Sequence, residues 1–397
     1  LQKVNKLPEQ QTKYAQGAAS NGKFLTADPG PDNVYGTPDD VTAGTPQSWG
    51  PTLESLGMTP YDNTKNFYQT GTTYTNNLSI DGGTENTTYR FSYSNMDNTG
   101  VMRNSYLKRN TIRVNADHKL SQKLTTGVSV SYVNTKSQLP QNGSTVAGPM
   151  LGLMRTPVSF NLSDYQYENG FNKTYFGGYD NPYYSIYKNP FNQSVNRVLG
   201  NAYLTYKPLE WLDVTYRLGL DNYSDYSRQV YAMSSNGYIF TDDQGYQKRL
   251  GEIDFNTLNS MTLNSDLTVA GHKKFGENWN TSLILGNNLY HNETKTIFSR
   301  GRKLSVPEFY NLSNASDLYT NNVIRAKRTY AYYADASIDY KSMVFLGLTG
   351  RNEWSSTFGT KKNNFFYPGV NAAFVISEAV KLPKWFSFAK VRAAYAE

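Results

Sequence analysis

Four arginines stand where charged side chains could contact a ligand. Each falls on the polar side of a stretch in which apolar and polar residues alternate with a period of two. Such charges could face a bound substrate or a neighbouring domain, or they could neutralise one another, because buried charges are usually paired. The pattern gives no single one a binding role, and we expect them to line an interior surface. They are Arg90, Arg113, Arg217 and Arg351.

Six tyrosines mark a second candidate site, in a long connection predicted over residues 136–195. A loop of that length is unusual unless it has a function. Aromatic faces can stack on sugar rings or pack against a partner, but they also fill the inside of large loops, and internal packing is the favoured interpretation. The six are Tyr165, Tyr167, Tyr179, Tyr183, Tyr184 and Tyr187.

An acidic cluster near the N-terminus could hold a calcium ion, since hard cations prefer several carboxylates. Its spacing differs from that of an EF-hand loop, so an unoccupied, turn-rich loop is the favoured interpretation and the calcium question stays open. The cluster consists of Asp28, Asp32, Asp39 and Asp40.

The residue types that enzymes use for nucleophilic or metal chemistry are sparse. The chain has no cysteine, and its three histidines, His118, His272 and His291, stand at or beside predicted turns without a nucleophile motif. We therefore predict no enzymatic activity, no metal site and no cofactor.

The elements that must position these residues are antiparallel hairpins. Within residues 74–134, Tyr89, Phe91 and Tyr93 alternate with polar residues, and three further runs repeat the pattern. Turn-forming segments near residues 82, 98 and 120 separate the runs. The clearest single strand covers residues 212–221, where a helix would scatter the apolar positions.

Composition limits the class of protein. Hydrophobic residues make up 38% of the 397 residues, mean hydropathy is −0.62, and no apolar run approaches the roughly 18 residues of a membrane helix. A membrane β-barrel remains compatible, because only every second strand residue faces lipid. The aromatic content of 14% favours barrel girdles over disorder. The net charge of +7 comes from dispersed residues, so we predict no nucleic-acid partner.

The lengths of the connections alternate along the chain. Short turns are expected near residues 82, 120, 208, 273 and 341, and longer excursions near 100, 136–195, 222–257, 291–325 and 354–364. Short turns at one end and long loops at the other are typical of an outer-membrane β-barrel with its long loops outside the cell. About twelve strands are expected, and because an open edge in lipid is costly, we expect the barrel to continue beyond this sequence.

Several motifs resemble those of the SusC/RagA-type TonB-dependent outer-membrane transporters. They include Gly50–Pro51 after Ser48 and Trp49, Asn77 to Gly83, Asp180–Asn181–Pro182, and Arg351 to Ser356. The resemblance implies a barrel of about 22 strands enclosing an N-terminal plug. It also implies a SusD-like surface lipoprotein as partner, energy from the TonB complex, and oligosaccharides or peptides as cargo. Neither a plug nor a TonB box has a counterpart here, so the chain matches the first half of the barrel.

The resemblance assigns residues 1–70 to the plug-to-barrel junction, the first strand and an outer loop, and residues 71–397 to transmembrane strands with long loops. It places the protein in a Gram-negative outer membrane. An adhesin or scaffold barrel that binds another surface protein without transport is the alternative. The barrel interpretation requires that the apolar side of each hairpin faces outward and the polar side encloses water.

Overall fold

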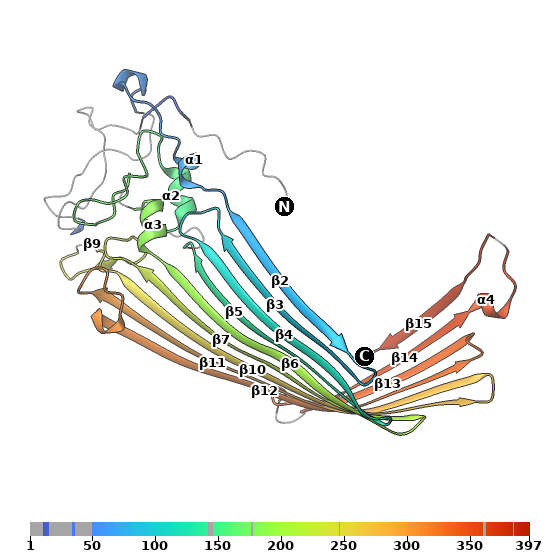
Figure 1. Ribbon diagram of the computed structural model, residues 1–397. Helices are drawn as coiled ribbons and strands as arrows, with labels where there is room; N and C mark the ends of the chain where they lie inside the picture. Colours follow the sequence, from blue (N-terminus) through green and yellow to red (C-terminus); the bar gives the residue numbers. More distant parts are fainter. Residues whose placement is uncertain are drawn as a thin grey trace.

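The computed structural model describes residues 11–15, 50–141, 146–175, 178–245, 247–359, 363–383 and 385–397, together with the backbone of residues 34–35 (Figure 1). Antiparallel strands dominate this part of the chain. Among the described residues, no helix is both long enough and apolar enough to cross a membrane.

A single antiparallel sheet of twelve strands forms the body of the molecule, and Figure 1 shows it as one curved layer. Each strand pairs with its neighbour in the chain order of the sheet, and β2 and β15 stand at the two edges. The strands are β2 (Thr72–Gly83), β3 (Thr87–Thr99), β4 (Tyr106–Ser121), β5 (Leu124–Leu139), β6 (Phe191–Leu209), β7 (Leu212–Tyr231), β10 (Glu252–Phe275), β11 (Trp279–Leu304), β12 (Ala315–Tyr340), β13 (Val344–Ser355), β14 (Asn364–Val375) and β15 (Lys390–Ala396). The expected twelve-stranded, all-antiparallel architecture is confirmed.

The remaining elements are short. A three-stranded sheet joins β1 (Val34–Tyr35), β9 (Gln247–Lys248) and β8 (Phe240–Thr241). The helices are η1 (Glu54–Leu56), α1 (Asn63–Phe67), α2 (Pro149–Arg155), α3 (Pro182–Lys188), η2 (Leu312–Asn314) and α4 (Ile376–Ala379). Helices α1, α2 and α3 gather at the end of the sheet that carries the long excursions (Figure 1).

The two faces of the sheet differ as the alternation predicts. On one face, here called the apolar face, large side chains are half exposed although they are hydrophobic, such as Leu78 at 57%, Leu285 at 50% and Leu348 at 52%. The other face, the polar face, carries Arg217, Asp266 and their neighbours. Figure 1 shows no second sheet packed on this layer, and the apolar side chains remain exposed, so the described sheet lacks the dry two-layer interior of a soluble sandwich.

The strands next to two predicted loops run much farther than the sequence indicated. The loops predicted over residues 222–257 and 291–325 are wrong in extent, because β7 continues to Tyr231, β10 begins at Glu252, β11 continues to Leu304 and β12 begins at Ala315. In these extensions polar residues occupy both faces, as in Asn292 to Thr296. The period-two signal of hydrophobicity therefore disappears while the backbone ladder continues.

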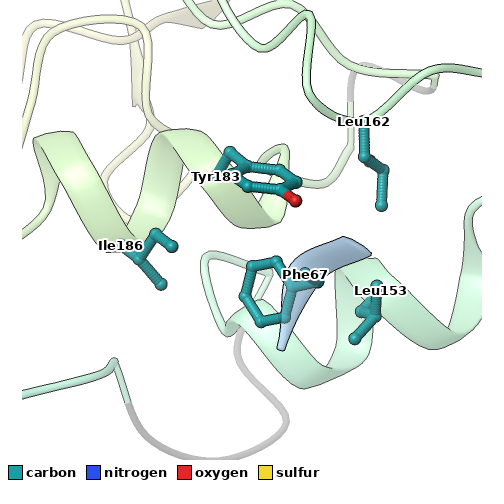
Figure 2. Close-up of a cluster of buried hydrophobic side chains, with 5 residues drawn as sticks. All are labelled: Phe67, Leu153, Leu162, Tyr183 and Ile186. Atoms are coloured by element: carbon teal, nitrogen blue, oxygen red, sulfur yellow. The ribbon is translucent and has the colours of Figure 1, made fainter. Parts of the chain in front are cut away.

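The long excursion between β5 and β6 packs around a buried apolar cluster at the end of the sheet. Phe67 of α1 meets Leu153 of α2 and Tyr183 and Ile186 of α3, with Leu162 completing a buried apolar cluster (Figure 2). We call the described residues 50–70, 140–190 and 232–251 the loop body. It consists of the segment before β2 and the excursions that follow β5 and β7.

Candidate functional site: a polar belt across the sheet

Register places polar-face side chains from neighbouring strands in one row. Asp117 of β4 lies opposite Gly127, which lies opposite Tyr203 of β6, and Tyr203 lies opposite Arg217 of β7. The row continues from Arg217 to Asp266 of β10 and Asn288 of β11, and Tyr333 of β12 lies opposite Arg351 of β13. We call this row the polar belt, and its members are Asp117, Tyr203, Arg217, Asp266, Asn288, Tyr333, Arg351 and Glu353.

Hydrogen bonds join the belt across strands. The Tyr203 hydroxyl donates to Asp117 Oδ1 at 2.6 Å, and the Tyr333 hydroxyl donates to Asp266 Oδ1 at 2.9 Å. Asn288 Nδ2 lies 3.3 Å from Asp266 Oδ2, while its own Oδ1 accepts from Arg351 at 3.4 Å. The belt therefore contains two hydrogen-bonded groups, Asp117 with Tyr203 and Asp266 with Tyr333, Asn288, Arg351 and Glu353. Arg217 stands in register between them.

Two glycines let the belt tyrosines lie flat across the neighbouring strand. A Cβ added at Gly127 would stand 2.3 Å from the Tyr203 ring, and one added at Gly286 would stand 2.0 Å from the Tyr333 ring. Any larger residue there would displace the ring and break its bond to the aspartate. The glycines are therefore part of the belt, although they carry no functional group.

The four sequence-predicted arginines fall into two groups. Arg217 and Arg351 belong to the belt, where Arg351 forms an ion pair with Glu353 at 2.6 Å. Arg113 bonds Asn115 at 3.3 Å and Ser129 at 3.4 Å on β4 and β5, and Arg90 of β3 reaches Ser79 at 3.5 Å. Three of the four guanidinium groups therefore bond to neighbouring polar groups, and Arg217 lies opposite Tyr203 and Asp266 in the register.

Sequence reasoning missed the residues that connect the arginines. Asp266, Asn288, Tyr203 and Tyr333 become a site only when strands separated by long excursions are brought into register. One signal was present, since Gly127 and Gly286 interrupt strands at the positions where a neighbouring tyrosine crosses. A glycine in a strand interior often marks such a close approach.

The six loop tyrosines divide by exposure. Tyr183 and Tyr184 are buried at 7% and 2%, so their rings belong to the interior of the loop body. Tyr165 and Tyr187 stack beside Tyr183, and Tyr187 remains 41% exposed. The other two lie half-buried beneath cations, with Lys173 over the Tyr167 ring and Arg155 over the Tyr179 ring. Tyr187 is the member of the set that offers the most surface to a ligand.

A buried aspartate fastens two excursions of the loop body together. Asp180 is 1% exposed, and its Oδ1 accepts from Asn172 Nδ2 at 3.2 Å and from the Asn236 backbone N–H at 2.6 Å. Its Oδ2 accepts from Asn189 Nδ2 at 3.1 Å and from the Ser235 hydroxyl. Burial raises the pKa of the Asp180 carboxyl, and the hydrogen bonds from Asn236, Ser235 and Asn189 oppose that rise. Residues from the excursions after β5 and after β7 therefore converge on one carboxyl group.

The histidines lie in strands and not together. His118 contacts the Thr87 hydroxyl at 2.7 Å near the end of β4, and His272 lies in β10 close to its turn. The placement of His291 beside a turn was wrong, because it stands in the middle of β11. Among the described residues no group of three potential metal ligands occurs, and Asp28, Asp32, Asp39 and Asp40 lie outside the described residues.

Comparison with known proteins relates this sheet to outer-membrane receptors. The chain is 28% identical over 333 residues to the TonB-dependent receptor P26 of Formosa agariphila, a match that covers 81% of this chain and 32% of that protein. It is 28% identical over 135 residues to the TonB-dependent receptor SusC of Bacteroides thetaiotaomicron, covering 34% of this chain and 14% of SusC. No protein-family model matches the chain.

Solved structures agree on the fold. The RagAB peptide transporter superposes with a TM-score of 0.71 at 16% sequence identity, over 85% of this chain and 38% of that one. The open-open state of the RagAB peptide importer superposes with a TM-score of 0.72. The chain is therefore similar to part of the β-barrel of the SusC/RagA-like TonB-dependent receptors. It spans about a third of the length of the P26 receptor, at 32%.

The relatives are outer-membrane β-barrel proteins of Gram-negative bacteria, and the exposed apolar face of this sheet has the alternating pattern of a surface that faces lipid. Aromatic side chains mark both borders of the lipid contact, with Phe275, Trp279 and Tyr340 at the tight-turn end and Tyr330 and Trp354 at the other. The stretch of β12 between Tyr330 and Tyr340 has the length of about 9–11 residues that a spanning strand needs. We call the Tyr330–Trp354 pair the outer aromatic border.

Proposed function

We propose that this chain forms part of a TonB-dependent transporter of the SusC/RagA type, which imports oligosaccharides or peptides across the outer membrane. The observation that carries the proposal is the combination of one curved antiparallel layer, with exposed apolar side chains on one face, and a hydrogen-bonded polar belt on the opposite face. Its relatives are named as receptors and transporters, and the RagAB structures share its fold.

The polar face would enclose the aqueous interior of the barrel. Arg90, Arg113, Arg217 and Arg351 would line this interior and meet either the passing cargo or a plug domain. Arg351 is held by Glu353 and Asn288, so its guanidinium is positioned before any ligand arrives. Arg217 adds a positive charge in the same row, which suits carboxylate or hydroxyl groups on a peptide or glycan.

The loop body would meet partners outside the cell. In this proposal a SusD-like lipoprotein covers the long-loop end and contacts exposed aromatic side chains such as Tyr187, whereas the TonB complex supplies energy from the periplasmic side. Residues 1–70 would join a plug to the barrel and contribute an outer loop. The described part of this segment supports that assignment, since Phe67 packs into the loop body and β2 starts at Thr72.

Growth of a deletion strain tests the proposal. We expect the strain to grow normally on monosaccharides and amino acids but poorly on at least one oligosaccharide or peptide mixture, and the intact gene should restore growth. The double variant Arg217→Gln/Arg351→Gln should restore growth less well at limiting cargo. Lys341→Gln, at the tight turn after β12, serves as the matched control because it removes a cation far from the belt.

Two results would contradict the transport proposal. One is a deletion strain that grows like the parent on every glycan and peptide offered. The other is a deletion strain that imports normally but loses attachment to a surface or to another surface protein, which would support the adhesin or scaffold alternative. Copurification of a surface lipoprotein with the barrel tests the proposed partner separately.

A further inference from the structure

The apolar face carries a groove at the outer aromatic border that the transport proposal does not use. The groove has a volume of about 600 Å³, within the size range of small-molecule sites. Its floor contains Leu218 of β7, Leu263 of β10 and Leu289 of β11, and Tyr330 and Trp354 form its side wall. Leu218 and Leu289 are 44% and 50% exposed, so the groove is open to the lipid phase.

The aromatic wall is rigid. The rings of Tyr330 and Trp354 stack with centroids 4.7 Å apart and planes 6° from parallel, and Tyr332 meets Trp354 edge-on at 6.2 Å. Stacked and edge-on pairs hold rings in fixed orientations. The groove therefore presents a preformed apolar channel of the kind that an acyl chain fills by dispersion contacts.

A cationic end closes the groove on the side of the long excursions. Arg328 of β12 and His291 of β11 both line it, lie opposite each other in register, and share a contact of 3.3 Å from Arg328 Nε to His291 Nδ1. Backbone and hydroxyl bonds between Arg328 and Ser356 fix this strand position. Within the described part of the chain, no carboxylate lies at ion-pair distance from Arg328, and the nearby Glu293 pairs with Lys295 at 2.7 Å.

The position of Arg328 along the membrane normal indicates which group it could bind. Arg328 stands two residues beyond Tyr330 along β12, on the same face and farther from the tight turns. Since aromatic borders lie at the level of the lipid headgroups, Arg328 is at the level of headgroup phosphates. Leu289 lies opposite Tyr330, and Leu218 lies in the same row, two residues nearer the tight turns than Arg328, where the acyl-chain region begins. The apolar floor of the groove thus suits the acyl chain of a lipid, and its cationic end suits the phosphate of the same lipid.

We propose that this groove binds a phosphorylated lipid of the outer leaflet, with its phosphate on Arg328 and His291 and an acyl chain along Leu218 and Leu289 beside the Tyr330–Trp354 wall. Nothing in the proposed transport activity assigns this site. The inference requires only that the apolar face meets lipid, so it stands whether or not the barrel imports cargo.

Binding of phosphatidic acid to the protein purified from the outer membrane tests the proposal. The protein is placed in nanodiscs of phosphatidylcholine containing a small fraction of phosphatidic acid, and the lipids it retains are counted by native mass spectrometry. Wild type should retain phosphatidic acid in preference to phosphatidylcholine. Arg328→Gln should weaken that preference about tenfold, whereas Arg328→Lys should keep much of it. Lys327→Gln, the next residue on the polar face, should leave it unchanged.

A second variant separates the acyl-chain contact from folding. Bromine-labelled phosphatidic acid should quench part of the tryptophan fluorescence of wild type, and diacylglycerol with the same bromines should quench it less. In Trp354→Phe this quenched part of the fluorescence should be missing. Folding of each variant is checked by the heat-dependent gel mobility of barrels. If Arg328→Gln does not fold, His291→Gln replaces it, with a weaker loss expected.

Several outcomes would overturn the proposal. Equal retention of phosphatidic acid by wild type and Arg328→Gln removes the role of the cation, and an equal loss in Lys327→Gln shows a nonspecific charge effect. Binding of inorganic phosphate as tight as that of phosphatidic acid would indicate an anion site without a lipid. Protection of Trp354 by a partner protein in the purified complex would make the groove a protein interface instead.

Discussion

Single residues in the polar belt act through shape as much as through charge. Tyr333 reaches Asp266 because Gly286 between them on β11 carries no side chain. Alternation in the sequence predicted correctly that Arg217 and Arg351 share a face. It could not predict that Gly286 lies opposite Tyr333, because residues far apart in sequence meet only through strand register, which the hydrophobic pattern sets weakly on a polar face.

Gly286→Ala should therefore destabilise the barrel, whereas Gly219→Ala should not. An added Cβ at Gly286 meets the Tyr333 ring at 2.0 Å, while one at Gly219 finds its nearest atom at 3.8 Å. Forcing the ring away should cost about 1–3 kcal/mol and the bond to Asp266. Gel mobility after stepwise heating measures the difference, and equal unfolding temperatures for the two variants would contradict the tight fit.

At the scale of elements, the loop body is tied together by amide side chains and not by regular structure. The sequence predicted a long packed connection over residues 136–195, and the packing is present around Phe67 and Tyr183. The contact between this connection and the excursion after β7 was not predictable, because it depends on hydrogen bonds that Asn236 and Ser235 of that excursion donate to Asp180. Polar contacts of this kind leave no period in the sequence.

Asp180→Asn should loosen the loop body without unfolding the sheet. The NH2 group of the new asparagine would replace one of the two accepting oxygens. It would then face the N–H and O–H donors of Asn189 and Ser235, or the N–H donors of Asn172 and Asn236. Leaving buried donors unpaired costs about 1–3 kcal/mol. Hydrogen exchange should become faster in residues 172–189 and 232–236, and unchanged exchange there alongside normal protection of β7 and β10 would disprove the tie.

The same carboxyl group predicts how the loop body responds to pH. Burial raises the pKa of Asp180 above its ordinary value of 3.8, so the folded loop body binds this proton more tightly than the unfolded chain. The resulting stabilisation is complete below the ordinary pKa and is lost as pH rises through the raised folded pKa. Protection factors in residues 172–189, corrected for intrinsic exchange, should rise on acidification in wild type. The Asp180→Asn variant should show a flatter profile.

For the whole molecule, the sequence predicted the number and pairing order of the strands because the apolar face repeats its signal in every hairpin. It underestimated β10, β11 and β12, whose ends leave the lipid zone and so carry no apolar signal. The physical boundary of the hydrophobic pattern is the edge of the bilayer, not the end of the strand. Length beyond that edge depends on backbone pairing, which any polar residue can maintain.

A charge placed on the lipid face should be far more harmful than the same charge on the opposite face. Leu285→Arg stands midway between the aromatic borders and should cost about 2–4 kcal/mol, whereas Ser337→Arg on the polar face meets water. Assembly in the outer membrane and heat-dependent gel mobility measure both. Equal tolerance of the two variants would show that the apolar face does not meet hydrocarbon.

The extended ends of β10, β11 and β12 determine how far the sheet projects beyond the lipid zone. From Tyr290 to Leu304, β11 continues for roughly 14 residues past the lipid zone, and at about 3.3 Å per residue and a tilt near 45° this wall rises roughly 30 Å. A molecule bound at the loop body would lie well above the membrane surface. The ends of these strands therefore lie above the headgroup layer and not within it.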